Sequence, residues 1–122
     1  PAVRAAAVDL AASRFGRLDV LVNNAGTCDG GPLHEQSLAA VTDVLTLNLV
    51  AAVDLCRLAG PLLFERHGSS VINVASIYGL VGSRAPMTAY AARGGVAKGF
   101  STDMVYPGRW VVRGCARERD AR

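Results

Sequence analysis

The sequence predicts an α/β fold, a partial doubly wound parallel sheet with flanking helices. Three observations carry this prediction. Residues 2–15, 37–67 and 87–100 have a helical composition or apolar residues at helical spacing. Residues 18–22 and 69–76 contain short, nearly continuous apolar runs, which are typical of strands buried on both faces of a parallel sheet. Helices and strands therefore alternate with short connections, the order found when helices join parallel strands.

The first predicted helix covers residues 2–15 and ends before Gly16, a residue common at helix C-termini. A strand at residues 18–22 follows it. Glycine and proline in residues 27–36 then predict a loop. The apolar stripe of the helix consists of Val3, Ala6, Ala7, Leu10 and Ala11.

The longest predicted helix begins at Ser37, which is a good N-cap residue, and runs towards His67. Pro61 predicts a kink in this helix or the loss of its last turns. Gly68 ends it, and the loop after the second strand leads to a third helix near Met87. The apolar positions of the long helix recur every three or four residues, at Leu38, Val41, Leu45, Leu49, Ala52 and Leu55.

The composition is that of one soluble globular domain. Its 122 residues are 51% hydrophobic and 19% charged, which excludes a disordered chain. No apolar run reaches the roughly 18 to 20 residues that a membrane span needs, so we expect no membrane association. The chain begins at Pro1 without a visible secretory signal. Three widely spaced cysteines and two isolated histidines predict reduced thiols, no metal site and a cytoplasmic location.

The net charge of +3 comes from the end of the chain. Residues 1–108 hold eight basic and eight acidic side chains, whereas residues 109–122 hold five arginines against two acidic residues. Arginines without interleaved aromatic residues are more typical of a solvated segment than of a nucleic-acid site. We therefore expect one α/β domain at residues 1–108, a basic, disordered tail at residues 109–122, and no nucleic-acid partner.

Polar side chains follow both predicted strands. Asn23 and Asn24 end the first strand, and Ser76 lies just past the second. In open α/β sheets, ligands bind at the carboxyl ends of strands, although an asparagine-rich turn is an equally good interpretation of the first pair. Tyr90 begins the third helix on the same side. Its phenol has an ordinary pKa of about 10, so acid–base work near neutral pH needs a nearby cation.

Four segments in order resemble the short-chain dehydrogenase/reductase family. They are "LDVLVNNAG" from Leu18, "LNLVAAVDLCR" around Asn48, "VINVASIYGLVG" ending the second strand, and "YAARGGV" from Tyr90. The resemblance covers about Ala2 to Phe100. It implies a Rossmann-like fold and hydride transfer between NAD or NADP and a small-molecule alcohol or carbonyl substrate.

The resemblance also implies roles for individual residues. Asn23, Asn24, Ala25 and Gly26 match a motif that stabilises the central sheet and lies beside the cofactor. Asn48 matches an asparagine that holds a water in a proton relay, Ser76 a serine that orients the substrate, and Tyr90 the general acid/base, which also contacts the cofactor. Without the family, a water-bridged helix amide, a strand-end hydroxyl and a packing aromatic are the simpler interpretations of the last three residues. The helix at residues 37–67 resembles one that forms subunit interfaces, which implies a homo-oligomer.

Three features depart from the family pattern. Gly94 occupies the lysine position of YxxxK, with Arg93 one residue earlier. No TGxxxGxG turn precedes Leu18, so we expect the N-terminal strands of the family to be lacking. The segment at residues 106–108 resembles the family's PG motif but follows Tyr90 too closely. These departures leave a second hypothesis open, in which the chain is a non-catalytic remnant or a partner-binding fragment.

Overall fold

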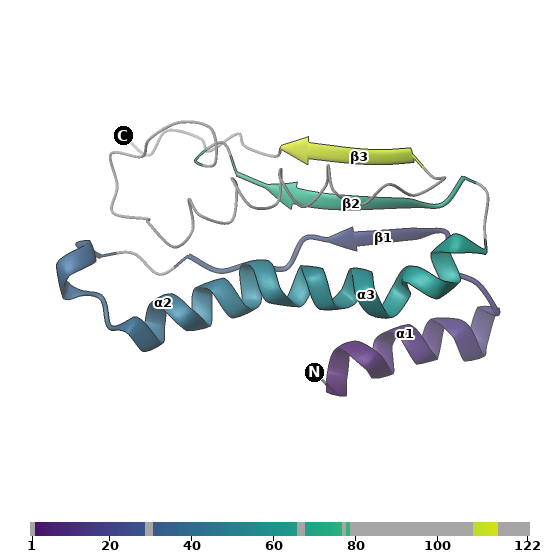
Figure 1. Ribbon diagram of the computed structural model, residues 1–122, viewed down its shortest axis with the longest axis horizontal. Coiled ribbons are helices and arrows are strands. Elements are labelled where there is room, and N and C mark those ends of the chain that lie inside the picture. Colours follow the sequence, from purple (N-terminus) through teal and green to yellow (C-terminus); the bar gives the residue numbers. More distant parts are fainter. Residues whose placement is uncertain (1, 29–30, 66–67, 77, 79–108, 115–122) are drawn as a thin grey trace.

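The computed structural model describes residues 2–28, 31–65, 68–76, 78 and 109–114 (Figure 1). Helices and strands alternate along the chain, as predicted. The elements are α1 (Ala2–Phe15), β1 (Val20–Asn23), the short 3-10 helix η1 (Leu33–Glu35), α2 (Leu38–Leu45), the π-helical segment η2 (Thr46–Val50), α3 (Ala51–Phe64), β2 (Ser70–Ala75) and β3 (Arg109–Gly114). The third predicted helix, at residues 87–100, lies outside the described residues.

The three strands form one parallel sheet in the order β1-β2-β3. Val20 pairs with Ser70 and Asn23 with Asn73, so the carboxyl ends of β1 and β2 lie at one edge. All three arrows in Figure 1 point the same way. This arrangement confirms the predicted α/β fold with parallel strands and flanking helices.

Strand β3 lies in the segment that the sequence assigned to a disordered tail. Its residues Arg109–Gly114 pair in parallel with β2, from Ser70 opposite Arg109 to Ala75 opposite Gly114. The structure therefore differs from the prediction for residues 109–114, whereas residues 115–122 lie outside the described part. The physical reason is the short run Trp110–Val112, whose aromatic and β-branched residues favour strands and can extend a sheet that offers an unpaired edge.

Helices α1 and α3 lie on one side of the sheet, and α2 continues the line of α3 beyond the carboxyl ends of the strands (Figure 1). The core beneath α3 is formed by Cys56, Ala59 and Leu63 of that helix against Val71 of β2. Three partly buried residues complete it, namely Val8, Leu18 and Leu21. Because side chains alternate along a strand, Val20 and Val22 point away from α3, and 48% and 53% of their surfaces are exposed. The prediction that this strand is buried on both faces therefore holds only for the α3 face.

The long helix runs without a break from Leu38 to Phe64 through η2. Its N-cap is Ser37, as predicted, because the Ser37 Oγ accepts a hydrogen bond of 3.1 Å from the Ala40 N–H. Pro61 lies inside α3 and does not split off the last turn, which continues to Phe64. The Ser69 hydroxyl then donates to the Leu63 carbonyl at 2.6 Å and caps the helix end.

This helix is also, by length and composition, apolar enough to cross a membrane, and it is the one such helix among the described residues. That observation is weak support for a membrane span, because the core helix of a soluble protein meets the same criterion. Here the helix packs on the sheet through Cys56, Ala59 and Leu63 and carries the ion-paired Asp54. A carboxylate on a lipid-facing helix is costly, whereas Asp54 is ion-paired with Arg4 and Arg57.

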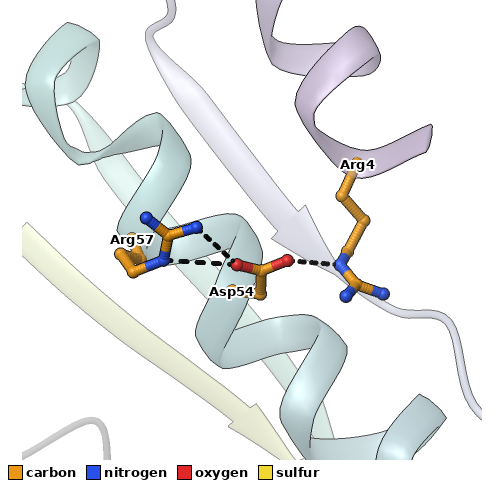
Figure 2. Close-up of polar contacts among 3 residues, drawn as sticks. All are labelled: Arg4, Asp54 and Arg57. Carbon is orange, nitrogen blue, oxygen red and sulfur yellow. Dashed lines mark hydrogen bonds and ion pairs between the residues drawn. The ribbon is translucent and has the colours of Figure 1, made fainter. Parts of the chain in front are cut away.

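An ion-pair cluster joins α1 to α3 (Figure 2). The Arg4 Nε of α1 donates to Asp54 Oδ2 at 2.7 Å, and the Arg57 guanidinium, one turn further along α3, donates to Asp54 Oδ1 at 2.9 Å. The hydrogen bond from Arg4, followed by that from Arg57, lowers the pKa of the Asp54 carboxyl. Two arginines thus hold one carboxylate in its ionised form between the helices.

We expect Asp54→Asn to lower the melting temperature at neutral pH, because Arg4 and Arg57 then lose their common anion. Since folding lowers the pKa of Asp54, its contribution is complete above the ordinary carboxyl range near pH 4 and is lost as the pH falls through the folded-state pKa. Thermal unfolding from pH 7 to pH 2.5, followed by circular dichroism, should show the two proteins converging in acid. Asp9→Asn, an exposed carboxylate on α1, is the control. A difference that stays constant with pH would contradict the assignment.

We expect Ser37→Ala to destabilise the protein by about 0.5–2 kcal/mol, because the Ala40 N–H loses its acceptor. Ser37→Asp restores an N-cap oxygen and should remain close to the parent protein in stability. Urea unfolding of the three proteins measures both effects. Equal losses in the alanine and aspartate variants would mean that Ser37 acts by something other than capping.

Candidate active site

Two buried asparagines face each other at the carboxyl ends of β1 and β2. Asn23 and Asn73 are partners in the parallel register, and only 7% and 4% of their surfaces are exposed. The Asn23 Nδ2 donates to Asn73 Oδ1 at 2.8 Å. The two strand ends are therefore joined by side chains as well as by the backbone ladder.

The same Asn23 amide group reaches α3. Its Nδ2 also donates to the Cys56 Sγ at 3.3 Å, while its Oδ1 is buried and has no hydrogen-bond partner among the described residues. Burial raises the pKa of the Cys56 thiol, and the hydrogen bond from Asn23 opposes this shift in part. Cys56 is thus a protonated thiol in the core, as expected for a structural cysteine.

Asn48 holds the chain that leaves β1. Its Oδ1 accepts from the Thr27 N–H at 2.7 Å, and its Nδ2 donates to the Thr27 carbonyl at 2.7 Å. Asn48 is 3% exposed, whereas Thr27 is exposed, so the two bonds are partly buried. The side-chain amide therefore binds both the N–H and the carbonyl of Thr27, as a residue of a neighbouring strand would. These bonds join the segment after β1 to the long helix.

Asn48 lies in the π-helical segment η2, Thr46–Val50. At the end of this segment the Ala51 N–H donates to the Thr46 carbonyl, five residues back rather than four. Such single-turn π segments inside α-helices are frequent at functional sites. The extra residue changes which side chains face the sheet, and here it places Asn48 against the Thr27 backbone.

Ser76 follows β2 and is buried, with 8% of its surface exposed. Its Oγ accepts a hydrogen bond of 3.3 Å from the Tyr78 N–H. That bond uses a lone pair of the hydroxyl and leaves its hydrogen available to another acceptor. Because β1 and β2 are neighbouring parallel strands, Ser76 extends from the same sheet edge as the segment after Asn23.

The segment Asn24, Ala25 and Gly26 is exposed and runs from Asn23 to Thr27, both of which are held by asparagine hydrogen bonds. Its small residues leave the backbone open to a ligand at this edge. Tyr90, Arg93 and Gly94 lie outside the described residues, as does the segment at residues 106–108. The structure thus joins Asn23 to Asn73 and Asn48 to Thr27. The catalytic and cofactor-binding roles of Asn48, Ser76 and Tyr90 stay predictions.

Two residues at this edge are absent from the sequence prediction. Asn73 lies inside an apolar strand, and Thr27 takes part through its backbone alone. The position of Asn73, three residues before Ser76, is a signal only when the parallel register with Asn23 is known. No group of three potential metal ligands occurs in the part of the chain that the structure describes.

Residues 2–106 match the short chain dehydrogenase family. The chain belongs to this family. It is 42% identical over 95 residues to cis-4-hydroxycyclohexanecarboxylate dehydrogenase of Sinomonas cyclohexanicum, a match that covers 76% of the chain and 38% of that enzyme. It is 39% identical over 84 residues to L-fucose dehydrogenase of Oryctolagus cuniculus, covering 68% of the chain and 29% of the enzyme.

Solved structures of the family share the fold. The structure of gluconate 5-dehydrogenase from Burkholderia cenocepacia J2315, in complex with NADP and tartrate, superimposes with a TM-score of 0.75 and 26% identity. That match covers 93% of the chain and 44% of the other structure. The chain therefore spans less than half the length of these relatives. It shares with the solved structure the α/β fold of parallel strands and flanking helices.

We expect Asn48→Ala to destabilise the protein by about 1–3 kcal/mol, because the Thr27 N–H and carbonyl then lose their partners. Thr46→Ala, at an exposed position of the same π segment, should change stability by less than about 0.5 kcal/mol. Urea unfolding measures the two values. Limited proteolysis should also cut the segment after β1 faster in Asn48→Ala alone; equal cleavage in both variants would show that Asn48 does not hold it.

Proposed function

We propose that this chain carries the catalytic part of an NAD(P)(H)-dependent short-chain dehydrogenase/reductase, with Tyr90 as general acid/base. The observation that supports the proposal most is the pair of hydrogen bonds between Asn48 and Thr27, at the sheet edge from which Ser76 also extends. Residues that match motifs of the family lie at this edge, and the relatives named above are dehydrogenases. The reaction is hydride transfer between a nicotinamide cofactor and an alcohol or carbonyl substrate.

The cofactor is NAD or NADP, and the exposed Asn24, Ala25 and Gly26 are the described residues that fit it. Their backbone groups face solvent at the carboxyl ends of the strands, where dinucleotides bind in open α/β sheets. When bound there, the cofactor would supply the nicotinamide chemistry of hydride exchange with the alcohol or carbonyl carbon of the substrate. The chain's own residues then handle the substrate oxygen and its proton.

Ser76 and Tyr90 share the substrate oxygen in this proposal. The Ser76 Oγ already accepts from the Tyr78 N–H, so its hydrogen donates to the substrate oxygen and orients it. Tyr90 takes the hydroxyl proton as the alcohol is oxidised and gives it back in the reverse direction. Asn48 holds a water of the proton relay in this proposal, while its side-chain amide is paired with the Thr27 backbone.

A cation is needed to lower the pKa of the Tyr90 phenol from its ordinary value of about 10. Gly94 supplies none at the family's lysine position, and Arg93, three residues after Tyr90 in the predicted third helix, is the cation that the sequence offers. A guanidinium keeps its proton, so Arg93 assists electrostatically and passes no proton on.

A non-catalytic, partner-binding fragment is the second candidate. Gly94 at the family's lysine position favours it, and so does the exposed apolar surface of the long helix. Val50 and Val53 are 49% and 37% exposed there, and Phe64 is 46% exposed. These side chains support a homo-oligomer built through this helix.

A cytoplasmic location is part of the proposal. Cys28 and Cys56 are both free thiols, one exposed and one buried. Unpaired thiols persist in reducing compartments, which supports this assignment.

We expect saturable binding of NADH or NADPH, measured by the change in cofactor fluorescence on titration with the purified chain. Given binding, Gly94→Lys should raise the turnover of a panel of carbonyl substrates, because an ammonium group then lies one helical turn from the phenol. Gly94→Ala removes the same glycine without adding charge and is the matched control. Tyr90→Phe should lower turnover by about 10²- to 10⁴-fold, the usual contribution of a general acid.

The opposite outcome identifies the second candidate. A folded chain that binds neither nucleotide at millimolar concentration is no dehydrogenase by itself. Sedimentation of the same sample then shows whether it self-associates.

A further inference from the structure

Asn73 is the buried partner that sets the orientation of Asn23. Its Oδ1 accepts from the Asn23 Nδ2 at 2.8 Å, across a pair that the parallel register places directly opposite each other. Both side chains lie on the sheet face that α3 covers, since Asn23 also contacts Cys56. The neighbouring pair on this face, Leu21 and Val71, is apolar.

This polar pair lowers the folding stability in a way that an apolar pair does not. The Asn23 Nδ2 serves both Asn73 and Cys56, while the Asn23 Oδ1 stays buried without a partner among the described residues. A buried acceptor without a donor destabilises a fold, and replacing a buried polar pair by apolar residues of the same shape is often neutral or better. Stability alone therefore does not account for the two asparagines, whereas a defined orientation of the strand ends does.

The segment after β1 is held at both ends by hydrogen bonds of buried asparagine side chains. Asn73 fixes its start through Asn23, and Asn48 fixes its end through Thr27. Between them lie three exposed residues, Asn24, Ala25 and Gly26. With both ends held, these residues have little freedom to move relative to β2 and to Ser76 at its end.

We propose that Asn73 is a positioning residue: by holding the Asn23 amide it places residues 24–26 relative to Ser76. This inference rests on the proposed function, in which residues 24–26 face the nicotinamide cofactor. Asn73 itself is buried beneath α3 and does not contact the cofactor or the substrate in this scheme. It acts through Asn23 and through the common register of the two strand ends.

Three variants test this role. Asn73→Leu keeps a similar volume and removes the acceptor, and Asn73→Asp keeps an acceptor oxygen facing Asn23. Val71→Ala, two residues earlier on the same face of β2, removes buried apolar surface without touching the asparagine pair. It is the control for general destabilisation. Each is studied as the full chain, with thermal unfolding recorded to show that it is folded.

The first measurement is the amide spectrum of ¹⁵N-labelled protein, which needs no cofactor. We expect Asn73→Leu to shift the backbone amide signals of residues 24–27, and Val71→Ala to leave them in place. The second is the fluorescence titration with NADH and NADPH. Asn73→Leu should weaken binding by about tenfold or more, the equivalent of one buried hydrogen bond, whereas Asn73→Asp and Val71→Ala should stay within about threefold of the parent.

Two results would overturn the proposal. Unchanged signals of residues 24–27 in Asn73→Leu would show that Asn73 does not place this segment, whether or not a nucleotide binds. Equal loss of binding in Asn73→Leu and Val71→Ala would reduce its role to stability. A parent chain that binds neither nucleotide instead overturns the proposed function and the cofactor-facing part of this inference, and the spectrum still decides whether Asn73 orders the segment.

Discussion

Two hydrogen bonds between the Asn48 side chain and the Thr27 backbone join the long helix to the end of β1. They depend on the π-helical segment Thr46–Val50, which brings Asn48 against the sheet edge while the helix continues to Phe64. Because Thr27 would otherwise have an unpaired backbone donor and acceptor in a partly buried place, the clamp satisfies two groups at once. The exposed segment before Thr27 owes its conformation to this constraint.

The sheet face beneath α3 changes from apolar to polar within two residues. Leu21 and Val71 pair in the core with Ala59 and Leu63, whereas Asn23 and Asn73 pair next to Cys56. The apolar half supplies the burial that stabilises the fold. The polar half joins the strand ends from which the candidate site extends, so one face of one sheet both stabilises the domain and orders its functional edge.

The helices are tied to this sheet by different kinds of interaction. Helix α3 packs through small and apolar residues, which allow a close approach to the strands. Helix α1 adds Val8 to the same core and a second attachment through Arg4 and Asp54 (Figure 2). The far face of β1 keeps Val20 and Val22 half-exposed.

The sequence by itself determined the order of helices and strands, the parallel sheet, the Ser37 cap and the family, because each depends on local composition, spacing or a contiguous motif. The ends of the two predicted strands also placed Asn23 and Ser76 at one edge of the sheet, and the family resemblance added Asn48 as a candidate site residue. Strand β3 was missed because a six-residue run has weak local preference and gains its stability from pairing with β2. Only the tertiary structure decided the partners of the polar groups: that Asn23 meets Asn73 and Cys56, and that Asn48 binds the Thr27 backbone. These contacts depend on strand register and on a helix irregularity, which bring together residues 21 to 50 positions apart and leave no periodic trace in the sequence.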